Sequence, residues 1–307
     1  MKKILPAPVS FMMRIWPGAF LLMCMLCISA VATAAEADAN PAEILRARYA
    51  ALQAQLSHNQ FQQPIYLSSN ESSGTLKGDI YARVDYPFAI VNATLKSPAH
   101  WCDVLILHLN IKYCHPVPAP DGTVLAVSIG SKHDQALEAA HRVNFNYRMT
   151  AATLDYFQTQ LNAAQGPLST KNYRIVLEAV SLGSGQTFLH LTYAYEYGFA
   201  GKLAMKTYLA TIGSGKVGFT VAGKQPDGQP DYIGGVRGLV ERNTMRYFLA
   251  IDAYLGAVSA PPAEQLDRRL QSWFTATERY SRQLHEVDRS AYIEMKRSEY
   301  VRQQTAP

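Results

Sequence analysis

The stretch WCDVLILHLNIKYC contains two of the four cysteines of this chain, Cys102 and Cys114. Cys102 and Cys114 could form a disulfide, bind a metal, act as a redox pair, or lie in the core as two thiols. Their spacing is much wider than that of a C-x-x-C redox motif. His108 and His115 do not complete a tetrahedral ligand set at a recognisable spacing. The choice between a disulfide and two thiols depends on the compartment in which the chain folds.

The N-terminal segment has the features of a secretory signal. Basic residues precede an apolar run at 19–31, small residues follow it, and we expect cleavage after Ala34 or Ala35. The run is too short for a comfortable membrane span, and no transmembrane span is expected after cleavage. The mature chain is therefore predicted to be periplasmic or secreted. A Cys102–Cys114 disulfide is then expected, with two buried thiols as the alternative.

The charge balance argues against a nucleic-acid partner. The chain has 29 Lys and Arg and 24 Asp and Glu, and the signal holds three of the basic residues and none of the acidic ones, so the mature chain carries 26 − 24 = +2. So small an excess gives no general support for nucleic-acid binding. The 48% hydrophobic content predicts a globular chain with one large core or two ordinary ones.

Sequence motifs that would identify an enzyme are missing or badly placed. The stretch GSGKVG matches G-x-G-x-x-G, but it follows a helical pattern and precedes a strand, the reverse of a dinucleotide site. The sequence contains no G-x-S-x-G, H-E-x-x-H or Walker motif. Glu178, His190 and Glu196 could do acid–base chemistry, but we interpret them as surface polar residues. No catalytic residue, cofactor or metal is predicted.

The elements that would position these residues begin with a helix. The segment NPAEILRARYAALQAQL places Asn40 as a cap and Pro41 at the first helical position. TLKGDIYARV alternates as a half-buried strand, and two short helices follow, at 88–95 and from Pro98. A second alternating strand is predicted from Leu105, with one wet face. Its faces would carry Leu105, Leu107, Leu109, Ile111 and Tyr113 on one side and His108, Asn110, Lys112 and Cys114 on the other.

The same alternation recurs in TVLAVSI, RVNFNYRM, YRIVLEAV and TFLHLTYAYEYGF, which favours an antiparallel sheet. GFAGKLAMKTYLAT predicts a helical insertion, and KVGFTVAG a further strand. Apolar residues at helical spacing from Val236 to Val258 predict a helix of about six turns. Arg237 and Glu241 are expected to form an ordinary surface pair on it. One more amphipathic helix would place its apolar stripe between Leu266 and Leu284.

This order of strand, two short helices, antiparallel strands and long helix resembles the helix-grip fold of START-like domains, the SRPBCC superfamily. The resemblance covers 64–257 and includes SPAHWCDVL and the helix that begins GLVERNTMRYFLAI. It implies an α+β fold in which a curved antiparallel sheet grips a long C-terminal helix, with extra N- and C-terminal helices. The predicted organisation is a signal at 1–35, an N-terminal helix at 36–60, a START-like domain at 61–258 and a helical extension at 259–307.

Such folds enclose an apolar cavity, so the resemblance implies binding of a lipid-like or other hydrophobic ligand. The residues expected to line the cavity are Leu107, Leu109, Phe145, Tyr147, Leu191, Tyr193, Tyr195, Tyr247 and Ile251. A filled core is the alternative interpretation of the same residues. An enzyme of the same fold and an envelope protein that binds a protein partner through its C-terminal helix are the alternative functions.

Overall fold

The computed structural model describes residues 40–211 and 215–305. The chain divides into two compact units, Met1–Ile44 and Leu45–Pro307. The predicted signal segment and Gly213 lie outside the described residues.

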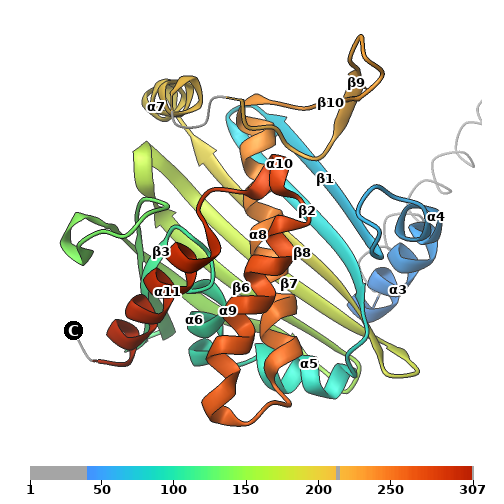
Figure 1. Ribbon diagram of the computed structural model, residues 1–307. Coiled ribbons are helices and arrows are strands. Elements are labelled where there is room, and N and C mark those ends of the chain that lie inside the picture. Colours follow the sequence, from blue (N-terminus) through green and yellow to red (C-terminus); the bar gives the residue numbers. More distant parts are fainter. Residues whose placement is uncertain (1–39, 212–214, 306–307) are drawn as a thin grey trace, which may run out of the picture. The chain divides into compact units, whose positions relative to one another are not determined.

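An eight-stranded antiparallel sheet is the central element of the second unit (Figure 1). Its spatial order is β1-β2-β8-β7-β6-β5-β4-β3. The first two strands form a hairpin, and the chain then crosses to the far edge and returns strand by strand until β8 pairs with β2. The predicted α+β class with an antiparallel sheet is confirmed. The strands are β1 (Ile65–Ser72), β2 (Thr75–Val84), β3 (Ile111–Ala119), β4 (Gly122–Ile129), β5 (His141–Ala152), β6 (Tyr156–Gln165), β7 (Thr170–Gly183) and β8 (Gln186–Tyr197).

The long helix α8 (Gly235–Ala257) lies across one face of this sheet, which we call the inner face (Figure 1). Alternate residues of neighbouring strands lie in rows across the inner face. Leu191 of β8, for example, lies opposite Ile80 of β2 on one side and Leu177 of β7 on the other. The helix approaches β2 closely at Gly78, where an added Cβ would lie 2.2 Å from Thr244 Oγ1. The helix-grip arrangement that the resemblance implies is therefore the fold of this chain.

Shorter helices surround the sheet and α8. We call the space between the inner face and α8, with the side chains that line it, the grip. Two of these helices connect β2 to β3, namely α5 (Phe88–Leu95) and α6 (Pro98–Leu105). The predicted insertion forms α7 (Phe199–Ala210), and the chain then makes the small hairpin of β9 (Val221–Lys224) and β10 (Pro230–Tyr232). The remaining helices are α3 (Pro41–Ala51), α4 (Gln53–Ser57), α9 (Pro262–Glu278), α10 (Ser281–Leu284) and α11 (Arg289–Gln304).

The strand predicted from Leu105 is wrong, because α6 continues to Leu105 and β3 begins only at Ile111. Helical turns continue past α6, since the Leu107 N–H donates to the Val104 carbonyl and the His108 N–H to the Leu105 carbonyl. Both leucines of the turn, Leu107 and Leu109, are buried. Alternate leucines in a fully buried turn match a strand pattern by spacing alone.

The predicted wet face of that strand is wrong as well, because Lys112 is fully buried. Its ammonium lies 2.9 Å from one oxygen of Glu299, and Lys296 lies 2.7 Å from the other. Lys296 also donates to the carbonyls of His108 and Ile111, and burial lowers its pKa to about 8. This ion cluster fastens α11 to the start of β3.

The terminal helices are more divided than the sequence predicts. The N-terminal helix breaks at Leu52, between α3 and α4. The apolar stripe predicted from Leu266 to Leu284 is shared by α9 and α10, and Leu270 and Trp273 are buried within this unit. Helix α11 was not predicted. The proposed partner contact through a C-terminal helix stays a prediction.

The Cys102–Cys114 disulfide is present and joins α6 to β3, with the two Cα atoms 5.1 Å apart. The predicted Cys102–Cys114 disulfide is confirmed. It closes the buried turn that contains Leu107, His108 and Leu109. The disulfide thus fixes one wall of the grip.

Candidate ligand-binding site

All nine residues predicted to line a cavity belong to one buried hydrophobic cluster. Two lie on β5, three on β8 and two on α8, as the alternation and the helical spacing predict. Leu107 and Leu109 reach the cluster from the turn after α6. The structure therefore brings the set together, and the predicted role of these residues in ligand binding stays a prediction.

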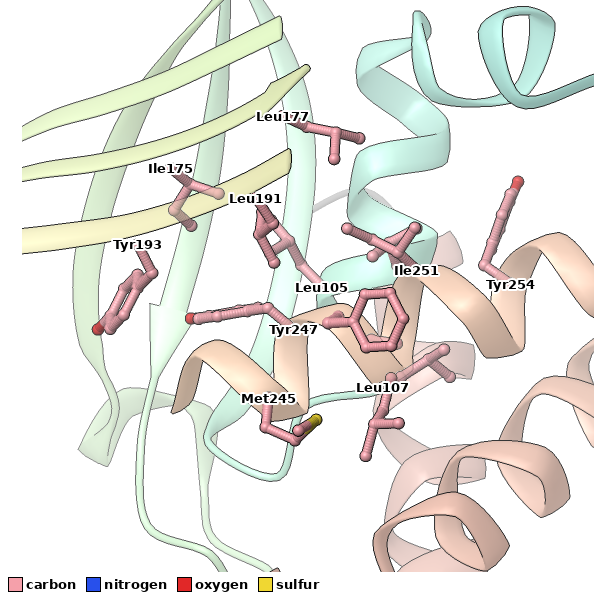
Figure 2. Packing of buried hydrophobic residues seen from close by; sticks show 14 of the residues in the cluster. Leu105, Leu107, Ile175, Leu177, Leu191, Tyr193, Met245, Tyr247, Ile251 and Tyr254 are labelled. Carbon is pink, nitrogen blue, oxygen red and sulfur yellow. The ribbon is translucent and has the colours of Figure 1, made fainter. Parts of the chain in front are cut away.

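Aromatic rings form a continuous row through this interior. Tyr247 of α8 stacks on His108 at 4.7 Å and contacts Tyr193 of β8 at 5.2 Å between ring centroids. Figure 2 shows Tyr247 reaching from α8 toward the sheet, where it meets Tyr193. Tyr173 of β7 continues the row and stacks on Tyr195 at 5.1 Å. The grip is thus lined by rings that carry polar edges, rather than by aliphatic side chains alone.

The hydroxyls of these tyrosines are held far from water. Burial raises the pKa of Tyr193 and Tyr195, and it raises the pKa of Tyr147 to about 12. Tyr173 shares a hydrogen bond of 2.8 Å with Thr170. The Tyr195 hydroxyl lies 3.8 Å from the Met205 sulfur, so α7 covers that end of the row. All of these hydroxyls are neutral over the physiological pH range and can act as hydrogen-bond donors.

His108 is a polar side chain inside this apolar interior, and one of its nitrogens has no partner. Only 2% of its surface is exposed. Burial lowers its pKa well below the usual value, and nearby cations, first among them Arg246, act in the same direction. The Asn110 N–H donates to Nδ1 at 3.1 Å, so the proton of the neutral ring lies on Nε2. Nε2 is buried without an acceptor among the described residues.

Thr159 is a second such group on the inner face. It lies on β6 between Leu177 of β7 and Met149 of β5 in the register, and it is 1% exposed. Its hydroxyl has no hydrogen-bond partner in the described part of the chain. A buried polar group without a partner costs roughly 1–3 kcal/mol, so each such group requires an explanation. The grip contains two of them.

The opposite, outer face of the same strands carries a different arrangement. His190 of β8 lies between two carboxylates, with Nε2 at 2.9 Å from Asp79 Oδ1 and Nδ1 at 2.8 Å from Glu178 Oε2. The Tyr81 ring stacks on the imidazole at 4.1 Å, and the Thr192 hydroxyl donates to Asp79 at 2.7 Å. We call Asp79, His190 and Glu178 the outer ion cluster.

The charges of the outer ion cluster support one another. Burial works against the charged form of His190, but hydrogen bonds to the two carboxylates prevail and raise its pKa. The same hydrogen bonds prevail over burial at Asp79 and Glu178 and lower their pKa values. Both ring nitrogens of His190 are occupied, so neither is free to take a proton from a substrate. Glu196 lies elsewhere, with Lys171 at 3.8 Å.

The surface pair predicted on the long helix is wrong. Glu241 is fully buried, and its two oxygens accept from the hydroxyls of Ser69 and Thr220 and from the N–H groups of Phe219 and Thr220. Arg237 donates to the carbonyl and the hydroxyl of Ser69. Both residues therefore bind β1, and Glu241 also binds the loop before β9.

Sequence reasoning did not include Tyr173, Thr159 or His108 in the predicted wall. Tyr173 could have been found, because it lies two residues before Ile175 in the alternation of YRIVLEAV. His108 was assigned to the wet face of a strand that does not exist. Thr159 lies in TLDYFQTQLN, whose own pattern is ambiguous between strand and helix. The turn-rich AAQGPLSTKN after it suggests a hairpin into YRIVLEAV, and β6 and β7 form that hairpin.

Five pockets of about 330 to 540 Å³ open at the surface of this unit. None of the nine predicted wall residues lines any of these five. Each of the nine is at most 9% exposed, so the grip is closed to solvent at these residues. Among the described residues, no group of three His, Cys, Asp or Glu side chains could hold a metal ion.

No helix in the described ranges is both long and apolar enough to cross a membrane. No protein-family profile and no curated protein matches the chain.

Solved structures give distant likenesses. Human StAR-related lipid transfer protein 5 is 10% identical, with coverage of 55% of this chain and 88% of that chain and a TM-score of 0.31. Ara h 8.0201 is 14% identical, with coverage of 60% and 99% and a TM-score of 0.33. Truncated norcoclaurine synthase from Thalictrum flavum is 11% identical, with coverage of 47% and 91% and a TM-score of 0.30. Likenesses this low transfer no function, so function must be argued from the site.

Proposed function

We propose that this protein binds a hydrophobic ligand with a hydrogen-bond acceptor, held between the inner face of the sheet and α8. The single observation that carries the proposal is the Nε2–H of His108, a buried donor without an acceptor among the described residues, on a ring that stacks on Tyr247. An acceptor on a bound molecule would remove the cost of leaving this donor unpaired. The aromatic row from Tyr247 to Tyr195 would contact the apolar body of the ligand.

Ligand entry would require the grip to open, because the nine predicted wall residues are at most 9% exposed. Helix α7 is the element best placed to move. It covers the Tyr195 end of the aromatic row through Met205, while Phe199 and Leu203 on the same helix remain 87% and 59% exposed. A helix with so little of its apolar surface buried can be displaced at a low cost in free energy.

Export to the periplasm or the medium is part of the proposal. It is supported by the signal-like N-terminus and by the Cys102–Cys114 disulfide, a bond that persists in oxidising compartments. N-terminal sequencing of the protein purified from its source should begin near Ala35 or Glu36. An N-terminus at Met1 would contradict export by a cleaved signal.

Native mass spectrometry of the purified protein, followed by organic extraction, tests the binding function. We expect one apolar molecule per chain, released unchanged into the organic phase. If the extract contains a chemically altered product of an added ligand, the protein is an enzyme. If extracts are empty and no hydrophobic fluorescent probe binds, the proposal is wrong.

The His108→Phe variant tests where the ligand binds. Phenylalanine keeps the stacking on Tyr247 but removes the Nε2–H, so affinity for an acceptor-bearing ligand should fall about tenfold, the equivalent of one hydrogen bond. Affinity for a pure hydrocarbon probe should be unchanged, which makes it the matched control. If His108→Phe binds the acceptor-bearing ligand as tightly as the wild type does, the site lies outside the grip.

A further inference from the structure

The strand β1 lies at the edge of the eight-stranded sheet and pairs only with β2 within that sheet. An edge strand presents backbone N–H and C=O groups that another chain can pair with. Which residues present them follows from the hydrogen-bond pattern. The Arg83 N–H donates to the Pro64 carbonyl, so Pro64 and Arg83 form a hydrogen-bonded pair.

Hydrogen-bonded and non-hydrogen-bonded pairs alternate along an antiparallel ladder. Tyr66 and Ser68 therefore point their backbone groups toward β2, and Leu67 and Ser69 point theirs away from it. The contact of Arg237 with β1 agrees with this pattern, since Arg237 Nη2 donates to the Ser69 carbonyl at 3.1 Å. The outward groups of Leu67 and Ser69 are thus directed to the open side of the sheet.

A groove of about 460 Å³ runs beside these outward groups. We call it the edge groove. The segment from Gln55 to Phe61 forms one side, Phe219 to Val221 and Arg237 form the other, and β1 residues from Ile65 to Ser69 line it. The rings of Phe61 and Phe219, 5.6 Å apart, give it an apolar end. Beyond these two rings lies a second pocket of about 540 Å³, lined in part by Arg279 and Arg282.

The charges along this path have one sign. The described residues that line the two pockets include Arg237, Arg279 and Arg282 but no aspartate or glutamate. Glu241 lies behind Ser69, and its oxygens are already occupied by Ser69, Phe219 and Thr220. A partner with negative charge is therefore complementary to the path.

We propose that the edge groove binds an extended, acidic polypeptide segment of a partner protein, which adds a ninth strand to the sheet beside β1. Outward N–H and C=O groups in strand spacing are satisfied by another backbone, which distinguishes a peptide from a purely apolar ligand. The apolar side chains of the segment would contact Phe61 and Phe219. Its carboxylates would lie near the arginines.

Arg237 has two roles in this arrangement. In the free protein its guanidinium occupies the Ser69 carbonyl and protects the edge. When a peptide N–H takes over that carbonyl, the guanidinium becomes available for a carboxylate of the same peptide. The exchange makes binding depend on both the backbone and the charge of the partner.

The test uses a synthetic peptide of alternating valine and threonine with a glutamate at each end, about seven residues long, like a typical strand. Binding to the full chain is measured by fluorescence anisotropy. Replacing the glutamates by lysines should weaken binding about tenfold. Methylating the backbone nitrogens on one edge of the peptide should weaken it by a similar factor, because those N–H groups pair with β1.

Variants with changes at the groove keep the test independent of folding. Val221 is exposed and lines the groove, so the longer side chain in Val221→Lys should obstruct the groove. Ala222→Lys, at an exposed neighbour that does not line the groove, is the matched control. We expect weaker binding of the acidic peptide in Val221→Lys than in Ala222→Lys, since the two add the same charge and only the first fills the groove.

Hydrogen exchange gives a residue-level outcome. In the free protein the amide of Leu67 should exchange faster than those of Tyr66 and Ser68, and bound peptide should slow Leu67 and Ser69 selectively. The proposal is overturned if the acidic peptide does not bind, or if it binds equally well with a methylated backbone. Equal binding to Val221→Lys and Ala222→Lys also overturns it. None of these outcomes depends on whether the grip holds a ligand.

Discussion

Two histidines on opposite sides of the sheet, one on a strand and one in the turn after α6, illustrate two ways of burying a polar group. His190 on the outer face uses both ring nitrogens, and each is bound to a carboxylate. His108 on the inner side uses one nitrogen and leaves the other buried without a partner. Their pKa values move in opposite directions, because carboxylates surround the first ring and burial among cations acts on the second. Thr192 and Thr159 repeat the contrast in their hydroxyls.

The difference separates a structural cluster from a candidate binding site. A fully bonded network stabilises the fold and has nothing left to offer a ligand. Unpaired polar atoms in an apolar interior cost stability in the free protein and are compensated only when something binds them. By this criterion the outer ion cluster holds β2, β8 and β7 together, and the grip is where we propose that a ligand binds.

The largest expected effect comes from replacing His190. In His190→Phe the carboxylates of Asp79 and Glu178 lose the cation between them, so the free energy of unfolding should fall by about 2 to 3 kcal/mol. Urea unfolding at a pH between 4.5 and 6.5, the unperturbed values of Glu and His, measures it. His108→Phe is the matched substitution and should stay within about 1 kcal/mol of the wild type, because the removal of an unpaired donor offsets the loss of the acceptor of the Asn110 N–H. Equal losses in the two variants would contradict the contrast.

The pH dependence of stability should separate the two histidines in a second way. The folded state raises the pKa of His190, so its contribution is present below 6.5 and is lost as pH rises through the raised value. The folded state lowers the pKa of His108, so the unfolded chain binds a proton there first, and stability falls as pH drops below 6.5. Stability from this pair of residues is therefore greatest near 6.5.

Each variant should remove one limb of that profile. His190→Gln should flatten the loss above 6.5, and His108→Phe should reduce the loss between 6.5 and 4.5. Below pH 4.5 the protein should lose further stability, because folding lowers the pKa values of Asp79 and Glu178. His108→Phe should retain this loss. Urea titrations at a series of pH values give these profiles. A profile unchanged in His108→Phe would mean that folding does not lower the pKa of His108.

The sequence predicts the strands and α8 well because their burial is periodic. Tyr193, Tyr195 and Leu191 recur every second residue, and Tyr247 and Ile251 recur one helical turn apart, so their positions follow from spacing. Leu107 and Leu109 are a case in which spacing predicts the wrong element. Their alternation comes from a buried turn closed by the Cys102–Cys114 disulfide, and no local pattern distinguishes such a turn from a strand.

The outer ion cluster was beyond sequence reasoning for another reason. Asp79, Glu178 and His190 come from three strands, and only the register brings them together, with Tyr81 and Glu178 both opposite His190. A shift of one residue would move each of them to the other face. Single-strand patterns therefore identify Glu178 and His190 as polar positions but cannot show that they bind each other. The unpaired state of His108 likewise depends on every element around it.

The smallest expected effect, and the most direct comparison of the two faces, comes from a pair of threonines. Thr192→Val removes a hydroxyl that donates to the Asp79 carboxylate at 2.7 Å and should cost about 1 to 2 kcal/mol. Thr159→Val makes the same chemical change at a hydroxyl without a partner, so the free energy of unfolding should stay the same or rise by up to about 1 kcal/mol. Urea unfolding of the two variants and the wild type, after organic extraction, measures the difference. If Thr159→Val is as destabilising as Thr192→Val, its hydroxyl is bonded in the ligand-free protein. The inner face would then be as fully satisfied as the outer one, and the unpaired donor of His108 would remain the only reason to place a ligand in the grip.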